Sequence, residues 1–181
     1  VATAEGDLER RLLYSATVRD IRGLYPKGAG QCRAEGWVRR VDGQWSGYIQ
    51  GRGTALALGG VEVSSVEAEG HWQDPARDAI DLRLAAGRAT YGALRLDRTD
   101  VTVRGTLSNH TLQAAVANRD GRLSLSLQGG YSRQTWAGRV QSAALQQNGY
   151  GSFHLLQPAS LSLSRKRLTA SPLSFAGPGR E

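Results

Sequence analysis

Apolar and polar residues alternate along most of this chain with a period of two. Leucine or valine takes every second position in several short segments, with aspartate, arginine, threonine, serine or glutamine in between: 81–84, 94–97, 101–104, 123–128 and 160–164. This alternation is typical of strands that bury one face and expose the other. A parallel sheet covered on both faces would instead show unbroken apolar runs. The pattern therefore predicts an all-β chain with antiparallel or mixed strands.

Turn signals separate these segments at intervals of about eight to twelve residues, the spacing of an all-β chain. The pairs Asp42-Gly43 and Asn148-Gly149 adopt positive φ at low cost, as tight hairpin turns require. One segment fits another interpretation, because Leu8 and Leu12 lie one helical turn apart and allow a short helix over residues 5–13. Residues 176–181, with their Gly-Pro-Gly sequence, are expected to form a disordered end.

Glycines and aromatic residues are predicted at the ends of these strands. The glycines, as turns or bulges, would let the sheet bend strongly. They are Gly36, Gly70, Gly105, Gly130 and Gly138. The aromatic rings would either fill a core or line an opening. They are Trp72, Tyr131, Trp136 and Phe153.

Length, charge and cysteine content exclude several classes of protein. The 181 residues suit a single β domain, and the absence of methionine leads us to expect a piece of a longer protein. The net charge is +7, but no run of five like charges occurs and aromatic residues make up only 7%, which argues against a nucleic-acid partner. The single cysteine, Cys32, excludes an internal disulfide or a cysteine-rich zinc site. No apolar run reaches the ~20 residues of a membrane-spanning helix.

Candidate catalytic residues are scattered rather than clustered. The three histidines, His71, His110 and His154, are isolated in the sequence, and we expect them to be exposed or to cap a turn. The nearest carboxylates, Glu62, Glu67 and Glu69, belong to an alternating strand and are expected to face solvent. No metalloprotease, nucleophile-elbow or phosphate-loop motif is present. The sequence therefore predicts no enzyme activity, no metal site and no cofactor.

A sheet with one long apolar face must cover that face. It can pack on a second sheet as a sandwich, close into a barrel, or curve into a trough whose apolar lining binds lipid. The residue pattern alone leaves these three options open.

The C-terminal half carries an ordered series of short motifs. They occupy residues 105–112 (Gly-Thr-Leu…His-Thr-Leu), 123–127, 136–138 (Trp-Ala-Gly), 151–155 and 157–163. This order resembles the periplasmic repeat region of the TamB family, the inner-membrane subunit of the bacterial translocation and assembly module. The resemblance covers about residues 82–175, with Phe153 where the family usually has tryptophan and no cysteine after Leu173. The first eighty residues match it only in their general strand character.

The resemblance implies a fold, a location and partners. The fold would be a curved, taco-like, U-shaped β-sheet with an apolar concave interior, an internal segment of a longer periplasmic β-structure. A membrane helix outside this sequence would anchor the protein in the inner membrane of a Gram-negative bacterium. The expected partners are the outer-membrane barrel subunit of the same module and phospholipid or unfolded outer-membrane protein strands. The expected function is phospholipid transfer between the two membranes and outer-membrane protein assembly.

The inward side chains of the alternating strands are the predicted groove. Burial of a ~16-carbon chain gains about 13 kcal/mol over water, much as a bilayer provides, so transfer from bilayer to groove is nearly neutral. Two alternatives remain open: a chaperone-like module that binds client strands by strand addition, and a closed β-sandwich scaffold. The predicted groove residues are Leu82, Leu84, Leu94, Leu96, Val101, Val103, Leu112, Leu123, Leu125, Leu127, Trp136, Phe153, Leu155, Leu161 and Leu163.

Overall fold

The computed structural model describes residues 1–73, 80–165 and 167–178. Within them, sixteen strands and one 3₁₀ turn, η1 (Ile21–Gly23), form the molecule. The strands in chain order are β1 (Ala2–Asp7), β2 (Arg11–Val18), β3 (Ala29–Val41), β4 (Gln44–Leu58), β5 (Val61–Gln73), β6 (Ile80–Ala86), β7 (Ala89–Tyr91), β8 (Leu94–Leu96), β9 (Arg98–Gly105), β10 (His110–Asn118), β11 (Gly121–Ser132), β12 (Thr135–Gln147), β13 (Gly151–Leu155), β14 (Ala159–Ser164), β15 (Leu168–Ala170) and β16 (Phe175–Ala176).

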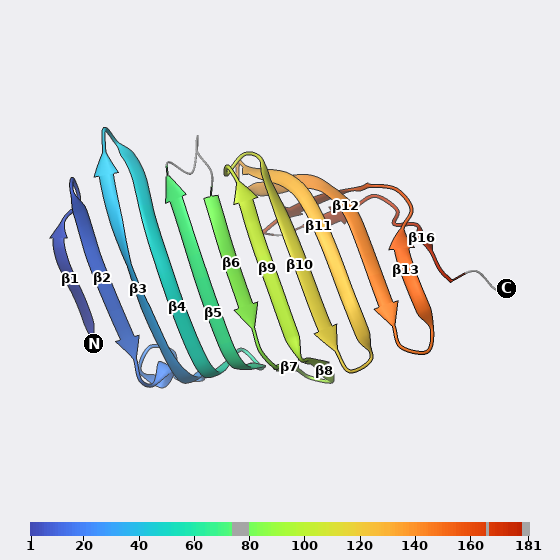
Figure 1. Cartoon of the computed structure of the whole chain (residues 1–181), viewed down its shortest axis with the longest axis horizontal. Helices are drawn as coiled ribbons and strands as arrows, with labels where there is room; N and C mark the ends of the chain where they lie inside the picture. The colour runs from blue at the N-terminus through green and yellow to red at the C-terminus, as the bar shows by residue number, and fades with distance from the viewer. Residues whose placement is uncertain (74–79, 166, 179–181) are drawn as a thin grey trace.

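All of these strands belong to one sheet, and every pairing is antiparallel. The main order is β1-β2-β3-β4-β5-β6-β9-β10-β11-β12-β13-β16, so nearly every strand pairs with its sequence neighbour (Figure 1). The short hairpin β7–β8 continues alongside β5, and β14 and β15 branch from β12. The sheet does not close, and the described residues contain no second sheet. The all-β prediction is confirmed, whereas the closed sandwich is not what the chain forms.

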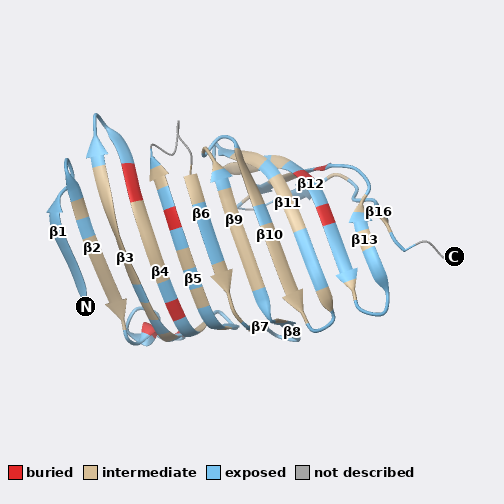
Figure 2. Cartoon of the chain, in the orientation of Figure 1, coloured by how far each residue is buried: buried red, intermediate tan, exposed pale blue. Residues whose placement is uncertain are grey.

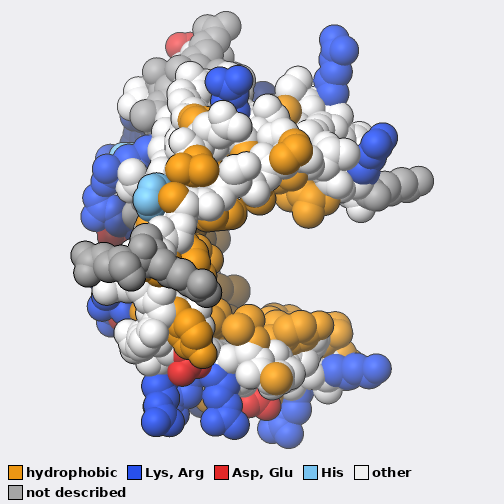
Figure 3. Space-filling model, turned by 90° about the vertical axis from the view of Figure 1, so that its right-hand side faces the viewer, with side chains coloured by type: hydrophobic (Ala, Val, Ile, Leu, Met, Phe, Trp, Pro, Cys, Tyr) orange, Lys and Arg blue, Asp and Glu red, His pale blue; other side chains and the backbone are white. Residues whose placement is uncertain are grey.

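Each strand curves along its own length, so the sheet is a trough. Viewed along the long axis, the molecule has a U-shaped cross-section with two arms (Figure 3). Hydrophobic side chains cover the inner surface of both arms, and lysine and arginine side chains lie on the outer surface and at the tips. This is the curved sheet with an apolar concave interior that the resemblance implied.

The strand register places inward side chains in rows that run along the trough. Directly opposite residues of an antiparallel pair lie on the same face of the sheet. The partners of Leu82, for example, are Gly70 on β5 and Val103 on β9. That row reads Tyr14, Gly36, Ile49, Gly70, Leu82, Val103, Leu112, Leu127, Val140 and Ala159. The next row reads Ala16, Ala34, Gly51, Ala68, Leu84, Val101, Ala114, Leu125 and Ala143.

The sheet forks at β12. One half of this strand pairs with β14 through residues 135–140, and the other half pairs with β13 through residues 144–147. Val140, Ala143 and Ala159 lie at the fork and, with Ile21, are the buried hydrophobic residues of the described chain (Figure 2). Because no second layer packs on either face of the sheet in the described chain, most other residues remain exposed or half-buried.

The short helix over residues 5–13 is a wrong prediction. The segment forms the β1–β2 hairpin, whose turn is fixed by the Arg10 backbone N–H, which donates to Asp7 Oδ1 at 2.7 Å. Pairing with β1 on one side and β3 on the other satisfies the backbone of β2, which outweighs the weak helical spacing of two leucines.

Residue 176, in the predicted disordered end, belongs to β16, and residues 179–181 lie outside the described residues. That expectation, and that of a single domain over 1–181, stay predictions.

Several glycines lie inside strands rather than at their ends. Gly36, Gly70 and Gly138 lie within β3, β5 and β12. A β-carbon at each would collide with a larger side chain or a backbone oxygen already in place. These glycines therefore admit a neighbouring side chain across the sheet, and Gly105, with φ of 122°, fills the predicted strand-end role.

Candidate functional site

The inward face of the trough gathers nearly all the predicted groove residues. Register and alternation place thirteen of them on this one face of β6 and β9–β14. They are Leu82, Leu84, Val101, Val103, Leu112, Leu123, Leu125, Leu127, Trp136, Phe153, Leu155, Leu161 and Leu163. Their role in binding stays a prediction, but their assembly on a common surface is a feature of the fold.

The other two predicted residues lie on the β7–β8 hairpin, at one edge of the trough. Leu94 and Leu96 reach the same hollow as Val116, Leu123 and Leu145, and together they line a mostly apolar cavity of about 410 Å³. The hairpin thus extends the apolar lining to the loops that join β10 to β11.

No second layer of the described chain packs over the inward leucines. Leu82, Leu84 and Leu123 keep 38%, 40% and 41% of their surface exposed, and Leu163 keeps 51%. No described side chain is fully buried. Contiguous apolar surface of this kind marks an interaction site in a soluble protein. The inward face of the trough is therefore a candidate binding surface.

Aromatic rings fill the places where inward glycines leave gaps. A β-carbon at Gly47 would collide with the Trp72 ring, and one at Gly129 would lie 2.6 Å from Trp136. Tyr14 covers Gly36 in the same way, and burial raises the pKa of its hydroxyl above the ordinary value. Each ring occupies the space that a β-carbon at the glycine would need, so the glycines make room for aromatic side chains on the trough floor.

Trp136 is held in place by His110, which the sequence predicted to be exposed or capping. Trp136 Nε1–H donates to His110 Nε2 at 2.8 Å, and their ring centroids are 6.3 Å apart. His110 Nδ1 therefore carries the proton and donates to the Thr106 carbonyl at 3.0 Å. His110 thus begins β10 as a half-buried, hydrogen-bonded member of the inward face, joining the β9–β10 turn to β12.

The outer face is polar and carries a ladder of ion pairs. Asp81 contacts Arg104 at 3.3 Å, and Arg98 contacts Asp100 at 2.6 Å. Hydrogen bonding from Arg98 holds the pKa of the Asp100 carboxyl below its ordinary value. These pairs lie across neighbouring strands or two residues apart, and they keep this face in water.

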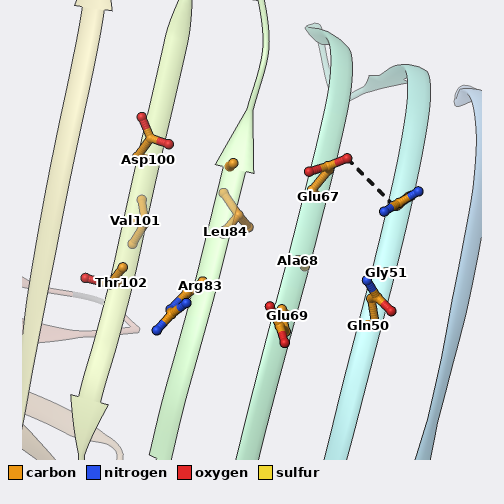
Figure 4. A pocket seen from close by; sticks show the side chains of 12 residues that line it. Gln50, Gly51, Glu67, Ala68, Glu69, Arg83, Leu84, Asp100, Val101 and Thr102 are labelled. Carbon is orange, nitrogen blue, oxygen red and sulfur yellow. Dashed lines mark ion pairs between the residues drawn. The ribbon is translucent and has the colours of Figure 1, made fainter.

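A shallow hollow of about 250 Å³, with both polar and apolar lining, lies on the same outer face (Figure 4). Glu67 and Glu69 line it from β5, and Glu67 pairs with Arg52 at 3.7 Å. Both glutamates face solvent, as the sequence predicted. The described residues contain no cluster of histidine, cysteine, aspartate or glutamate that could hold a metal ion.

The predicted groove contains none of the inward residues of β2–β5. Leucine or valine alternation is broken there by alanine and glycine, as in the series Cys32, Ala34, Gly36 and Val38. The alternation of small residues with charged ones could have identified this strand, because Arg33 and Glu35 separate the three small residues of positions 32–36.

Comparison with known proteins decides the family. A family model of the TamB N-terminal domain matches residues 2–171. The chain belongs to the TamB family. The match includes the first eighty residues, for which the sequence analysis found only general strand character, and it agrees with the open curved sheet. Neither a curated protein nor a solved structure matches the chain.

Membership of the TamB family carries coarse functional information. It links the chain to the translocation and assembly module, to an outer-membrane component of that module, and to the cell envelope. The family is one of bridging and assembly proteins rather than of enzymes. In the described part of the chain, no helix is long and apolar enough to cross a membrane.

Proposed function

We propose that this chain is a segment of a periplasmic trough that carries phospholipid between the inner and outer membranes, with the acyl chains on the inward face. The observation that carries the proposal is the open apolar surface, continuous in register from β2 to β14 and half-exposed along its length. In the same proposal the segment works with the outer-membrane barrel subunit of its module in outer-membrane protein assembly. An inner-membrane anchor outside this sequence would hold it in place.

The physical chemistry of the lining supports transfer rather than storage. The two rows through Leu82 and Leu84 are aliphatic, aromatic or glycine, so each buried CH₂ of a lipid gains about 0.8 kcal/mol, close to its gain in a bilayer. The rows run along the trough rather than across it, so a chain can move from one strand to the next over a uniform surface. No chemical step is needed along such a path.

Two adjacent residues on β11 provide the test. Leu125 faces inward and Ser124 faces outward, so Leu125→Asp places a charge in the trough and Ser124→Asp places the same charge outside it. We expect native mass spectrometry of the purified protein to detect bound phospholipid in the wild type and in Ser124→Asp, and none in Leu125→Asp. Circular dichroism verifies that each variant is folded.

If Leu125→Asp fails to fold, a second inward variant, Leu84→Asp, can still test the proposal. Leu84 is 40% exposed, so Leu84→Asp leaves its new charge in contact with water and perturbs packing less. Phospholipid retained by the folded Leu84→Asp protein, or absent from the wild type after incubation with lipid, contradicts the proposal.

Strand addition at a sheet edge is the second candidate function. Within the described chain, β1 pairs only with β2, and all six of its residues are exposed. An open edge of this kind can accept an extended strand of an outer-membrane protein. This candidate predicts that a client peptide binds equally to the wild type and to Leu84→Asp, and that Ala4→Pro, which removes a backbone N–H facing the open edge, weakens binding. Peptide binding lost in Leu84→Asp alone would place the peptide in the trough instead.

A further inference from the structure

Arg40 is a charged side chain on the inward face of the trough. Arg40 follows Val38 in the inward series of β3 and is the cross-strand partner of Trp45 on β4. In the two rows traced above, which pass through Leu82 and Leu84, every position is aliphatic, aromatic or glycine. Arg40 is exposed and lies near the end of its strand, at the edge of the trough.

The Arg40 guanidinium is positioned by an aromatic ring. It lies over Trp45, with 5.4 Å from its central carbon to the ring centroid. Stacking of this kind restrains the planar guanidinium and leaves its N–H groups, which lie in that plane, able to donate. The Arg40 backbone N–H donates to the Leu8 carbonyl, which fixes the β1–β2 turn beside it.

Arg40 forms no ion pair with a described carboxylate, unlike five arginines of the outer face. Among the described residues, Arg33, Arg52, Arg83, Arg98 and Arg104 each form an ion pair on the outer face. The Arg40 guanidinium is therefore not neutralised by any carboxylate of the described chain and can donate to an anionic ligand.

An apolar lining begins immediately beside this cation. Gly47 is the cross-strand partner of Val38, and the Trp72 ring lies over it. Residues two apart on a strand are separated by about 7 Å, so the cation and the start of the apolar floor lie roughly one glycerol unit apart. A molecule with an anionic group joined directly to hydrocarbon chains complements this arrangement.

We infer that Arg40, held against Trp45, is a subsite for the phosphate of a glycerophospholipid whose acyl chains lie in the trough. The inference rests on the proposed function and adds the headgroup chemistry that the site recognises. A guanidinium donates two parallel hydrogen bonds to phosphate oxygens, which gives it a preference for a phosphoryl group over an uncharged hydroxyl.

Two soluble lipids with the same chains separate headgroup from chain binding. Dioctanoyl phosphatidylglycerol carries the phosphate, and dioctanoylglycerol lacks it. We expect Arg40→Gln to weaken binding of the phospholipid about tenfold, measured by isothermal titration calorimetry, and to leave dioctanoylglycerol binding unchanged. Arg139→Gln is the matched control, because Arg139 is exposed on the outer face of β12, and it should change neither affinity.

The remaining outcomes separate this inference from the proposed function. If the wild type binds neither lipid, the proposed function fails. A different outcome is that both lipids bind the wild type, and Arg40→Gln either leaves phosphatidylglycerol binding intact or weakens binding of both lipids equally. In that case the lipid-binding trough is supported and the phosphate subsite is wrong. Inorganic phosphate alone should show no measurable binding, since the acyl chains supply most of the affinity. Arg40-dependent binding of inorganic phosphate would instead assign the site to a free anion.

Discussion

Inward glycines differ in how closely their neighbours approach them. Gly36 is required because the Tyr14 ring and the Tyr48 carbonyl occupy the space where a β-carbon would stand. Gly51 lies on the same face in the neighbouring strand β4, two residues after the partner of Gly36. The nearest atom to a β-carbon built at Gly51 is the Arg33 carbonyl oxygen, at 3.7 Å. The same residue type is therefore a steric necessity at one position and an open space at the other.

Alanine substitution at these two glycines should have opposite effects. We expect Gly36→Ala to lower the free energy of unfolding by about 1–3 kcal/mol, because the new methyl group displaces Tyr14 or the backbone of β4. Gly51→Ala should leave it unchanged or raise it by up to ~1 kcal/mol, because alanine reduces the entropy of the unfolded chain. Urea unfolding followed by circular dichroism measures both. Equal destabilisation by the two variants would contradict the close packing of Tyr14 over Gly36.

At the scale of elements, local alternation predicted the strands well where inward residues are leucine or valine. The strands around residues 82–84, 101–103 and 123–127 appear in the structure as the sequence indicated. Prediction failed where it depended on distant pairing. The helix over 5–13 is a hairpin because β3 pairs with β2, and the acceptor for the Trp136 N–H lies 26 residues away at His110. Such contacts leave no local pattern.

The bridge from His110 to Trp136 should stabilise the junction of the β9–β10 turn with β12. His110→Ala leaves the indole N–H without its acceptor and removes the bond to the Thr106 carbonyl, so we expect a loss of about 1–2 kcal/mol in unfolding free energy. His154→Ala is the matched control, since His154 is an exposed histidine on β13; its effect should stay within about 0.5 kcal/mol. Chemical denaturation reports both values, and a loss no larger in His110→Ala than in the control would argue against the bridge.

At the scale of the molecule, alternation determines which residues share a face but not what covers that face. A sandwich, a barrel and a trough all require the same pattern in each strand, so the residues alone left them open. The order of motifs in residues 105–163 favoured the trough, and the structure agrees. The fork at β12 was not predictable, because it depends on one strand pairing with β14 along one half and β13 along the other.

A single curved layer should have stability that varies along its length. β4 and β5 are long and pair with strands on both sides, whereas β1 pairs on one side only and β15 is three residues long at an edge. Amide hydrogen exchange measured by mass spectrometry should therefore be slowest in residues 44–58 and 61–73 and at least about tenfold faster in β1 and β15. Without a second layer, the edge strands can open while the centre remains paired. Uniform protection across all strands would mean that the sheet unfolds as one cooperative unit, and lipid in the trough would then have to be exchanged without local opening of its ends.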